Sequence, residues 1–88
     1  LRTALGELNF ALIRREVAGI VTVSEREIAD ATRCLWEICK QVVEPSSAVV
    51  LAAVLARPGV FQGRRVGLVL SGGNVDLDAP LPWHGTFA

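Results

Sequence analysis

Ser71 is the residue of this sequence best placed to contact a ligand. It follows an unbroken apolar run, residues 66–70, and directly precedes Gly72 and Gly73. Glycines let a ligand approach the backbone closely, although two glycines alone indicate only a turn. The surrounding residues form neither the G-x-S-x-G frame of a nucleophile elbow nor the glycine spacing of a phosphate-binding loop. The pattern therefore favours a serine that hydrogen-bonds to a ligand over a nucleophilic serine.

Three other titratable side chains were considered as site residues, and only Glu44 remains a candidate. Glu44 lies between two apolar segments, where an ionised carboxylate is costly unless paired, so it is either a helix-terminus anion or a site residue. Lys40, the one lysine, lies on the charged side of its predicted helix, which favours a solvated side chain over a Schiff-base lysine. His84, the one histidine, has no orienting partner in its tail and is interpreted as a surface residue.

Cys34 and Cys39 are five positions apart within a predicted helix. This spacing is neither a C-x-x-C redox motif nor half of a zinc site, which would need further cysteine or histidine ligands. The sequence therefore predicts two reduced thiols, as in a cytoplasmic protein, and no metal site within the segment.

Two segments are predicted to be β-strands that position these residues. Residues 64–77 pass from two arginines through an apolar run without polar alternation, which is typical of a strand buried on both faces in a parallel sheet. Ser71 then lies beyond the carboxyl end of that strand, where open α/β sheets bind ligands. The short β-branched run at residues 20–23 predicts a second strand.

A long helix is predicted from a capping box, in which Ser24 is the N-cap and Glu27 follows three residues later. We expect this helix to reach about residue 42, with Arg33 and Glu37 paired on its surface. Trp36 lies off the main stripe and is expected to pack against another part of a larger protein or at a subunit contact. The buried stripe should consist of residues at spacings of three or four: Ile28, Ala31, Leu35, Ile38 and Val42.

Two further helices complete the predicted pattern. A short one at residues 11–17 should end near Gly19, and another should start at Pro45. Residues 48–56 are apolar on every face, so we expect that helix to be buried all round. The tail should be a loop that docks Trp83. Helix, strand, helix, helix, strand is the order of an α/β piece with a parallel sheet and crossover helices.

Composition limits the class of protein. The 88 residues are 51% hydrophobic with a mean hydropathy of +0.42, which is high for a free-standing domain, so we expect the chain to be part of a larger body. Nine basic and nine acidic residues cancel without forming a basic block, which disfavours nucleic-acid and anionic-membrane partners. The longest apolar run, residues 48–56, is too short to span a bilayer.

Two motifs together carry a family resemblance. The E-P-S-x-A motif at residues 44–48 and the S-G-G-N-V-D motif at residues 71–76 resemble the C-terminal part of the serine/threonine dehydratase family. These are pyridoxal-phosphate enzymes of fold type II and include serine racemase. Residues 22–28 also resemble the family, so the likeness covers nearly the whole chain. It implies that residues 1–88 are the C-terminal part of the catalytic, cofactor-binding domain, without a regulatory domain.

The resemblance implies roles for particular residues. Ser71 matches the serine that hydrogen-bonds to the pyridine nitrogen of the cofactor, beside Gly72, and Glu44 matches a glutamate near the cofactor. A neutral hydroxyl does not hold that nitrogen protonated, which suits elimination. Asn74 and Lys40 match residues that touch a nucleotide effector on the eukaryotic racemase branch. One departure is Ser47, which stands where the family commonly has glycine.

Other parts of such a site are expected upstream of this chain. They comprise the Schiff-base lysine, the glycine-rich phosphate loop and the residues that bind a divalent or monovalent cation. No catalytic residue is therefore expected within the segment itself.

The resemblance implies a parent enzyme that is cytoplasmic and homodimeric and that acts on a small amino acid. The leading hypothesis is a dehydratase that converts L-threonine or L-serine to ammonia and a 2-oxo acid. Serine racemase and 3-hydroxyaspartate dehydratase are the enzymatic alternatives. The non-enzymatic alternative is an isolated structural fragment, against which the apolar helix at residues 48–56 argues, since it would be exposed.

Overall fold

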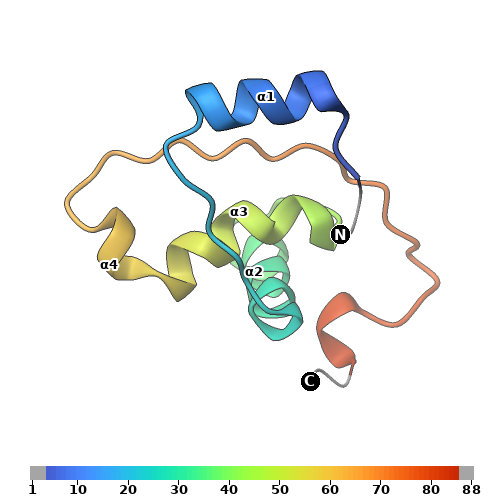
Figure 1. Ribbon diagram of the computed structural model, residues 1–88. Coiled ribbons are helices and arrows are strands. Elements are labelled where there is room, and N and C mark those ends of the chain that lie inside the picture. Colours follow the sequence, from blue (N-terminus) through green and yellow to red (C-terminus); the bar gives the residue numbers. More distant parts are fainter. Residues whose placement is uncertain (1–3, 86–88) are drawn as a thin grey trace.

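The computed structural model describes residues 4–85; residues 1–3 and 86–88 of the predicted domain lie outside that range. Figure 1 shows helices joined by long extended segments. The helical elements are α1 (Glu7–Glu16), α2 (Glu25–Glu37), α3 (Pro45–Ala56), α4 (Pro58–Phe61) and a 3-10 turn, η1 (Pro82–His84).

Helix α2 begins as predicted and ends early. The Ser24 hydroxyl accepts a hydrogen bond from the Glu27 N–H at 3.1 Å, and the Glu27 carboxylate accepts one from the Ser24 N–H at 2.8 Å. This confirms the capping box. The helix ends at Glu37 because the chain turns away at Lys40, whose φ is +59°. The predicted extension to residue 42 is therefore wrong.

The early end of α2 shortens its buried stripe. Ala31 and Leu35 are buried and Ile28 is half-buried, as the helical spacing predicts. Ile38 and Val42, however, are 71% and 57% exposed, because both lie beyond the helix and no longer share its face. The surface pair is confirmed, with Arg33 Nε 3.0 Å from Glu37 Oε2.

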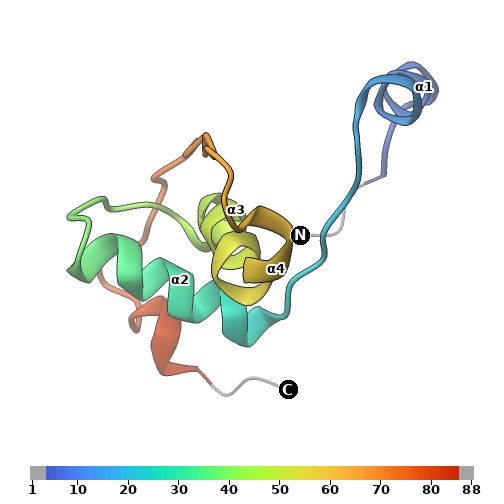
Figure 2. The ribbon, with the colours of Figure 1, turned by 90° about the vertical axis from the view of Figure 1, so that its left-hand side faces the viewer.

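The core lies between α2 and α3, which cross at a steep angle (Figures 1 and 2). Small side chains on α3 allow the two helices to approach closely. An ion pair between Glu27 and Arg57, at 3.2 Å, joins the start of α2 to the residue that follows α3. The buried apolar cluster consists of Ala31, Leu35, Val43, Ala48 and Ala52.

Helix α3 starts at Pro45, as predicted, but it is not buried all round. Ser47, Ala48 and Ala52 are buried, whereas Leu55 is 56% exposed. Within residues 4–85, α3 packs mainly against α2 and the short α4, so only part of its apolar surface is covered.

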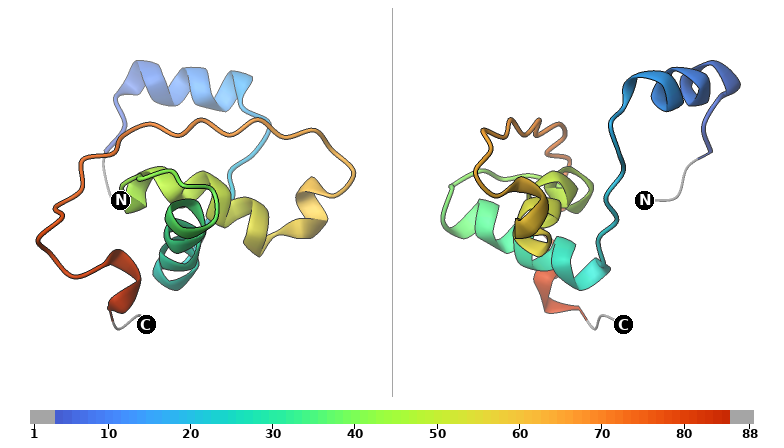
Figure 3. Two further views of the ribbon diagram at one scale, coloured as in Figure 1. Left: turned by 180° about the vertical axis from the view of Figure 1, so that it is seen from behind. Right: turned by 60° about the vertical axis from the view of Figure 1, so that its left-hand side comes forward.

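The two predicted strands are extended segments here, because residues 4–85 contain no strand for either of them to pair with. Residues 65–76 pass over α3 on the side away from α2 (Figure 3). The predicted burial on both faces is not observed: Val66, Leu68 and Leu70 are 38–41% exposed and Val69 is 79% exposed. Residues 20–23 are likewise unpaired, and Ile20 is 81% exposed.

Helix α1 stands apart from the other helices (Figure 2). It begins at Glu7 and ends at Glu16, where Val17 is its C-cap. The predicted helix at residues 11–17 is therefore too short at its N-terminal end, and Gly19 does not cap it. No residue of α1 is buried, and two of its apolar side chains, Phe10 and Ile13, border a hollow of about 350 Å³.

The tail docks onto α2, which confirms the predicted docking of Trp83. Its partner is Trp36, whose predicted contact with a larger protein or a second subunit stays a prediction. The Trp36 and Trp83 rings meet edge to face, with centroids 5.3 Å apart and planes at 87°. The Arg33 guanidinium lies over the Trp83 ring at 5.8 Å. Trp83 belongs to η1, so this contact fixes η1 against the C-terminal part of α2.

The charge of Glu27 in the capping box should make the stability of the fold depend on pH. The pKa of Glu27 is lowered from 4.5, chiefly by the hydrogen bond from the Ser24 N–H; burial opposes this shift, and the Ser24 hydroxyl and Arg57 lower the pKa further. A lowered pKa stabilises the fold above the unfolded pKa, and this contribution is lost as the pH falls through the folded pKa. Glu27→Gln in the full-length protein should therefore lower the melting temperature at neutral pH, and the deficit should shrink below pH 4.5.

Glu25→Gln is the matched control, since Glu25 lies in the same first turn but outside the capping box. It should change the melting temperature little at either pH. A Glu27→Gln deficit that is constant with pH would contradict the assigned role of the charge.

Candidate functional site

The candidate site lies where the two motifs, far apart in the sequence, come together. The backbone N–H of Glu44 donates a hydrogen bond to the carbonyl oxygen of Gly72, at 3.3 Å. Glu44 is the N-cap of α3 and has extended backbone angles (φ −74°, ψ 155°), as expected for a residue that precedes proline. The contact therefore joins the start of α3 to the turn that follows the apolar extended segment.

Gly72 is a glycine for two physical reasons. Its φ is +92°, a conformation that residues with a side chain rarely adopt. A Cβ at this position would collide with Oε1 of Glu44 and lie 3.0 Å from its Cδ. Gly73 is also tightly placed, because its Cβ would lie 3.1 Å from the carbonyl oxygen of Val42. The sequence predicted glycines that permit a close approach; in this chain it is Glu44 that approaches.

Ser71 is exposed, and its hydroxyl has no hydrogen-bond partner among residues 4–85. It directly precedes Gly72, so its backbone is held in place by the contact with Glu44. The structure therefore presents a free hydroxyl on a fixed turn, and its predicted role at a cofactor stays a prediction.

Sequence reasoning missed one residue that supports the site. The indole N–H of Trp36 donates a hydrogen bond to the carbonyl oxygen of Val43, at 2.8 Å. Val43 adjoins Glu44 and is 7% exposed. The only sequence signal was the position of Trp36 off the buried stripe of its helix, which indicated a contact without naming the partner.

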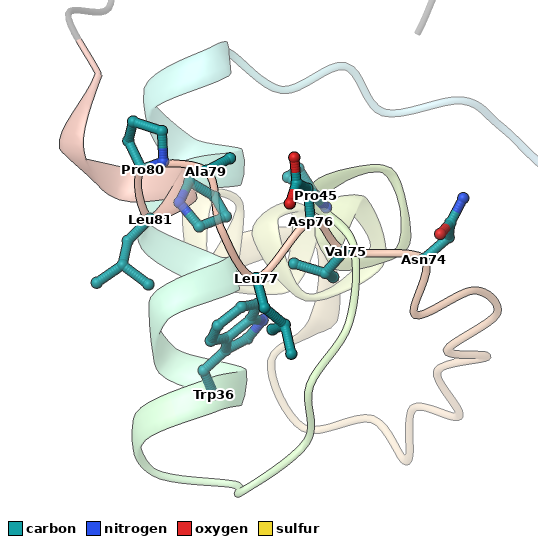
Figure 4. A pocket seen from close by; sticks show the side chains of 10 residues that line it. Trp36, Pro45, Asn74, Val75, Asp76, Leu77, Ala79, Pro80 and Leu81 are labelled. Carbon is teal, nitrogen blue, oxygen red and sulfur yellow. The ribbon is translucent and has the colours of Figure 1, made fainter.

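The predicted effector residues do not line a common hollow. Lys40 is exposed, and its ammonium donates to the carbonyl oxygen of Glu37 at 2.5 Å, which caps the end of α2. Asn74 lies at the edge of a mostly apolar hollow of about 260 Å³ and points away from its apolar side chains (Figure 4). Lys40 does not line this hollow. The other lining residues are Trp36, Pro45, Val75, Asp76, Leu77, Ala79, Pro80, Leu81 and Pro82.

The remaining reactive side chains show no assembled site. Among residues 4–85, no three His, Cys, Asp or Glu side chains lie close enough to hold a metal ion. Cys34 and Cys39 are free thiols, and burial raises the pKa of Cys34, with a further contribution from Cys39. His84 is exposed beside Trp83. No helix in the described part of the chain is long and apolar enough to cross a membrane.

The buried hydroxyl of Ser47 is expected to lower the stability of the fold. Its side chain is 5% exposed, and its hydroxyl oxygen has no hydrogen-bond partner in the described structure. An unpaired buried hydroxyl costs roughly 1–3 kcal/mol. Ser47→Ala in the full-length protein should therefore raise the free energy of unfolding by about 1 kcal/mol, measured by denaturant titration.

The exposed neighbour Ser46 provides the control, because Ser46→Ala removes a hydroxyl that water already solvates. It should leave the free energy of unfolding nearly unchanged. A loss of stability in Ser47→Ala would mean that the hydroxyl has a partner in the full-length protein.

The comparisons with known proteins agree with one another. A family model described as "Pyridoxal-phosphate dependent enzyme" matches residues 1–72. A beta-hydroxyaspartate dehydratase of Paracoccus denitrificans is 46% identical over 80 residues, which are 91% of this chain and 25% of that protein. A serine racemase of Arabidopsis thaliana is 45% identical over 82 residues, which are 88% of this chain and 25% of that protein.

A solved structure similar to this chain also comes from an amino-acid-converting enzyme, by its name. The crystal structure of a threonine deaminase from T.th. superimposes with a TM-score of 0.77 at 47% identity, covering 85% of this chain and 27% of that one. The chain thus spans about a quarter of the length of the proteins that it matches.

Proposed function

Because the chain belongs to the pyridoxal-phosphate-dependent enzyme family, we propose that it forms one wall of the cofactor site in a dehydratase. The whole enzyme would remove the β-hydroxyl of L-threonine or L-serine and release ammonia and a 2-oxo acid. The single observation that carries this proposal is the free hydroxyl of Ser71, held on a turn by the contact between Glu44 and Gly72.

The likeness to solved structures confirms the predicted fold class, a piece of the α/β fold of fold type II pyridoxal-phosphate enzymes. In open α/β sheets, ligands bind beyond the carboxyl ends of the strands. Ser71 follows the apolar extended segment directly, which agrees with such a location.

The residues present fit the cofactor. A pyridine nitrogen is a hydrogen-bond acceptor, and a serine hydroxyl can donate to it without carrying a charge. The Ser71 hydroxyl has no competing partner among residues 4–85, so it is available for that bond. We therefore assign Ser71 and Gly72 to the cofactor site, with Glu44 behind them.

When bound, pyridoxal phosphate withdraws electrons from the α-carbon of the amino acid. The part played by this chain is to hold the ring and set its charge. Ser71 keeps its own proton on Oγ and leaves the ring nitrogen uncharged, whereas a carboxylate in its place would favour a protonated nitrogen. Glu44 fixes the turn through its backbone N–H and fills the space against Gly72 with its carboxylate.

Two related activities are the alternatives. The relatives include a dehydratase of beta-hydroxyaspartate, a serine racemase and a threonine deaminase, all similar to this chain at 45–47% identity. We place the residues that choose among these substrates, together with the Schiff-base lysine and a cation site, in the upstream part of the enzyme. The proposal includes a cytoplasmic homodimer, in which Lys40 and Asn74 contact a nucleotide effector.

The isolated fragment is the non-enzymatic alternative. Ile20, Val69 and Leu77 are each about 80% exposed, and such surfaces disfavour a soluble monomer of 88 residues. Expressing the 88 residues alone decides this point. A soluble monomer with a cooperative thermal transition would favour the fragment.

The proposed function is tested on the full-length protein. It should show cofactor absorbance near the visible edge and release a 2-oxo acid and ammonia from L-threonine or L-serine. Parallel assays with 3-hydroxyaspartate, and chiral analysis of residual serine, separate the two alternatives. Absence of both cofactor absorbance and 2-oxo acid would overturn the proposal.

A further inference from the structure

Trp36 makes a directed contact with the segment that carries Glu44. Its indole N–H donates to the carbonyl oxygen of Val43 at 2.8 Å, across the turn at Lys40 that ends α2. The Val43 side chain belongs to the buried cluster. A hydrogen bond from α2 therefore fixes the backbone of the α2–α3 connection one residue before α3 is capped.

The same connection between α2 and α3 also contacts the glycine turn after Ser71. The N–H of Glu44 binds the carbonyl oxygen of Gly72 at 3.3 Å, and the carbonyl oxygen of Val42 closely faces Gly73. Residues 42–44 thus lie between the Trp36 indole and the glycine turn. A displacement of this backbone would move both partners of the contact that holds Ser71.

Trp36 is itself held in place. The Trp83 ring meets it edge to face at 5.3 Å, and Arg33 lies over Trp83. On another side, Trp36 borders the hollow beneath Leu77 (Figure 4). Its ring therefore contacts Trp83 of the tail and borders a hollow that the segment after the glycine turn also lines.

We propose that Trp36 is a positioning residue, which sets the place of Ser71 through the backbone of residues 42–44 and the glycine turn. The inference rests on the proposed function, in which Ser71 contacts the cofactor. It assigns no chemistry to the indole; the hydrogen bond to Val43 determines how well the Ser71 hydroxyl is aligned.

The test compares Trp36→Phe with Trp83→Phe in the full-length protein. Trp36→Phe keeps an aromatic ring but removes the donor to Val43, whereas Trp83→Phe keeps that donor and an edge-to-face contact. The readouts are hydrogen–deuterium exchange of the Glu44 amide and the dissociation constant of pyridoxal phosphate. Trp36→Phe should speed exchange and weaken cofactor binding, each about fivefold, as the loss of one hydrogen bond predicts. Trp83→Phe should stay within about twofold of the wild type in both.

Two results would overturn the inference. One is wild-type amide exchange or wild-type cofactor affinity in Trp36→Phe. The other is an equal change in both tryptophan variants, which would indicate general loosening of the fold. Ser71→Ala separates this inference from the proposed function, because wild-type cofactor absorbance in that variant would overturn the assigned cofactor contact itself.

A measurement on the wild type keeps the inference testable if Trp36→Phe does not fold. Coupling between two sites is reciprocal, so bound cofactor should slow exchange of the Trp36 indole N–H. Comparing apo and cofactor-loaded protein by NMR measures this. Equal exchange rates in the two states would overturn the inference.

Discussion

Gly72→Ala is expected to weaken cofactor binding more than any other single substitution proposed for this chain. An alanine at φ +92° carries a backbone cost of roughly 1–3 kcal/mol. Its Cβ would also collide with Oε1 of Glu44, so either the carboxylate or the turn must move. Since Ser71 is the preceding residue, the hydroxyl moves with the turn. We expect cofactor affinity to fall roughly 10- to 100-fold, measured by absorbance titration of the full-length protein.

Two glycines provide graded controls. Gly59 lies in α4 with an ordinary φ, and a methyl group added there would meet nothing within 4 Å, so Gly59→Ala should bind cofactor like the wild type. Gly73 has an ordinary φ but a close neighbour, the carbonyl oxygen of Val42 at 3.1 Å, so Gly73→Ala should have an intermediate effect. Wild-type affinity in Gly72→Ala would refute the assigned dependence of cofactor binding on the conformation of this turn.

Local signals in the sequence predicted the structure well where neighbours in the chain determine it. The capping box at Ser24 and the proline start of α3 depend on residues a few positions apart, and both form as predicted. The end of α2 carried no such signal. Its left-handed turn uses Lys40, a residue type that sequence rules do not associate with positive φ.

Burial was harder to predict because it depends on which partners are present. An unbroken apolar run predicts two covered faces, but Val69 is 79% exposed, since residues 4–85 supply no neighbouring strand. In the candidate site, too, the sequence predicted local features but not contacts between distant residues. The motifs located Glu44 and Ser71, whereas the Glu44–Gly72 contact and the Trp36 hydrogen bond join distant residues and required the structure.

Ser71→Ala is the second change with a large expected effect. It removes the only side-chain group that this chain is proposed to offer the cofactor ring, while leaving the turn and Glu44 unaltered. One lost hydrogen bond in the site is worth about 1 kcal/mol, so turnover should fall about five- to tenfold with a shift in cofactor absorbance. Ser71→Thr is the control, because it keeps a hydroxyl and suits an extended backbone. It should retain most of the activity and the wild-type absorbance.

Ser71→Asp tests the charge of the ring rather than the presence of a bond. A carboxylate at this position would stabilise a protonated ring nitrogen, which makes the ring a stronger electron acceptor. The ratio of racemisation to elimination should then change, and chiral analysis of serine alongside a 2-oxo acid assay measures both products. If Ser71→Ala and Ser71→Asp keep the wild-type absorbance, turnover and product ratio, Ser71 does not face the ring. The free hydroxyl at the end of the apolar segment would then need another partner in the full-length enzyme.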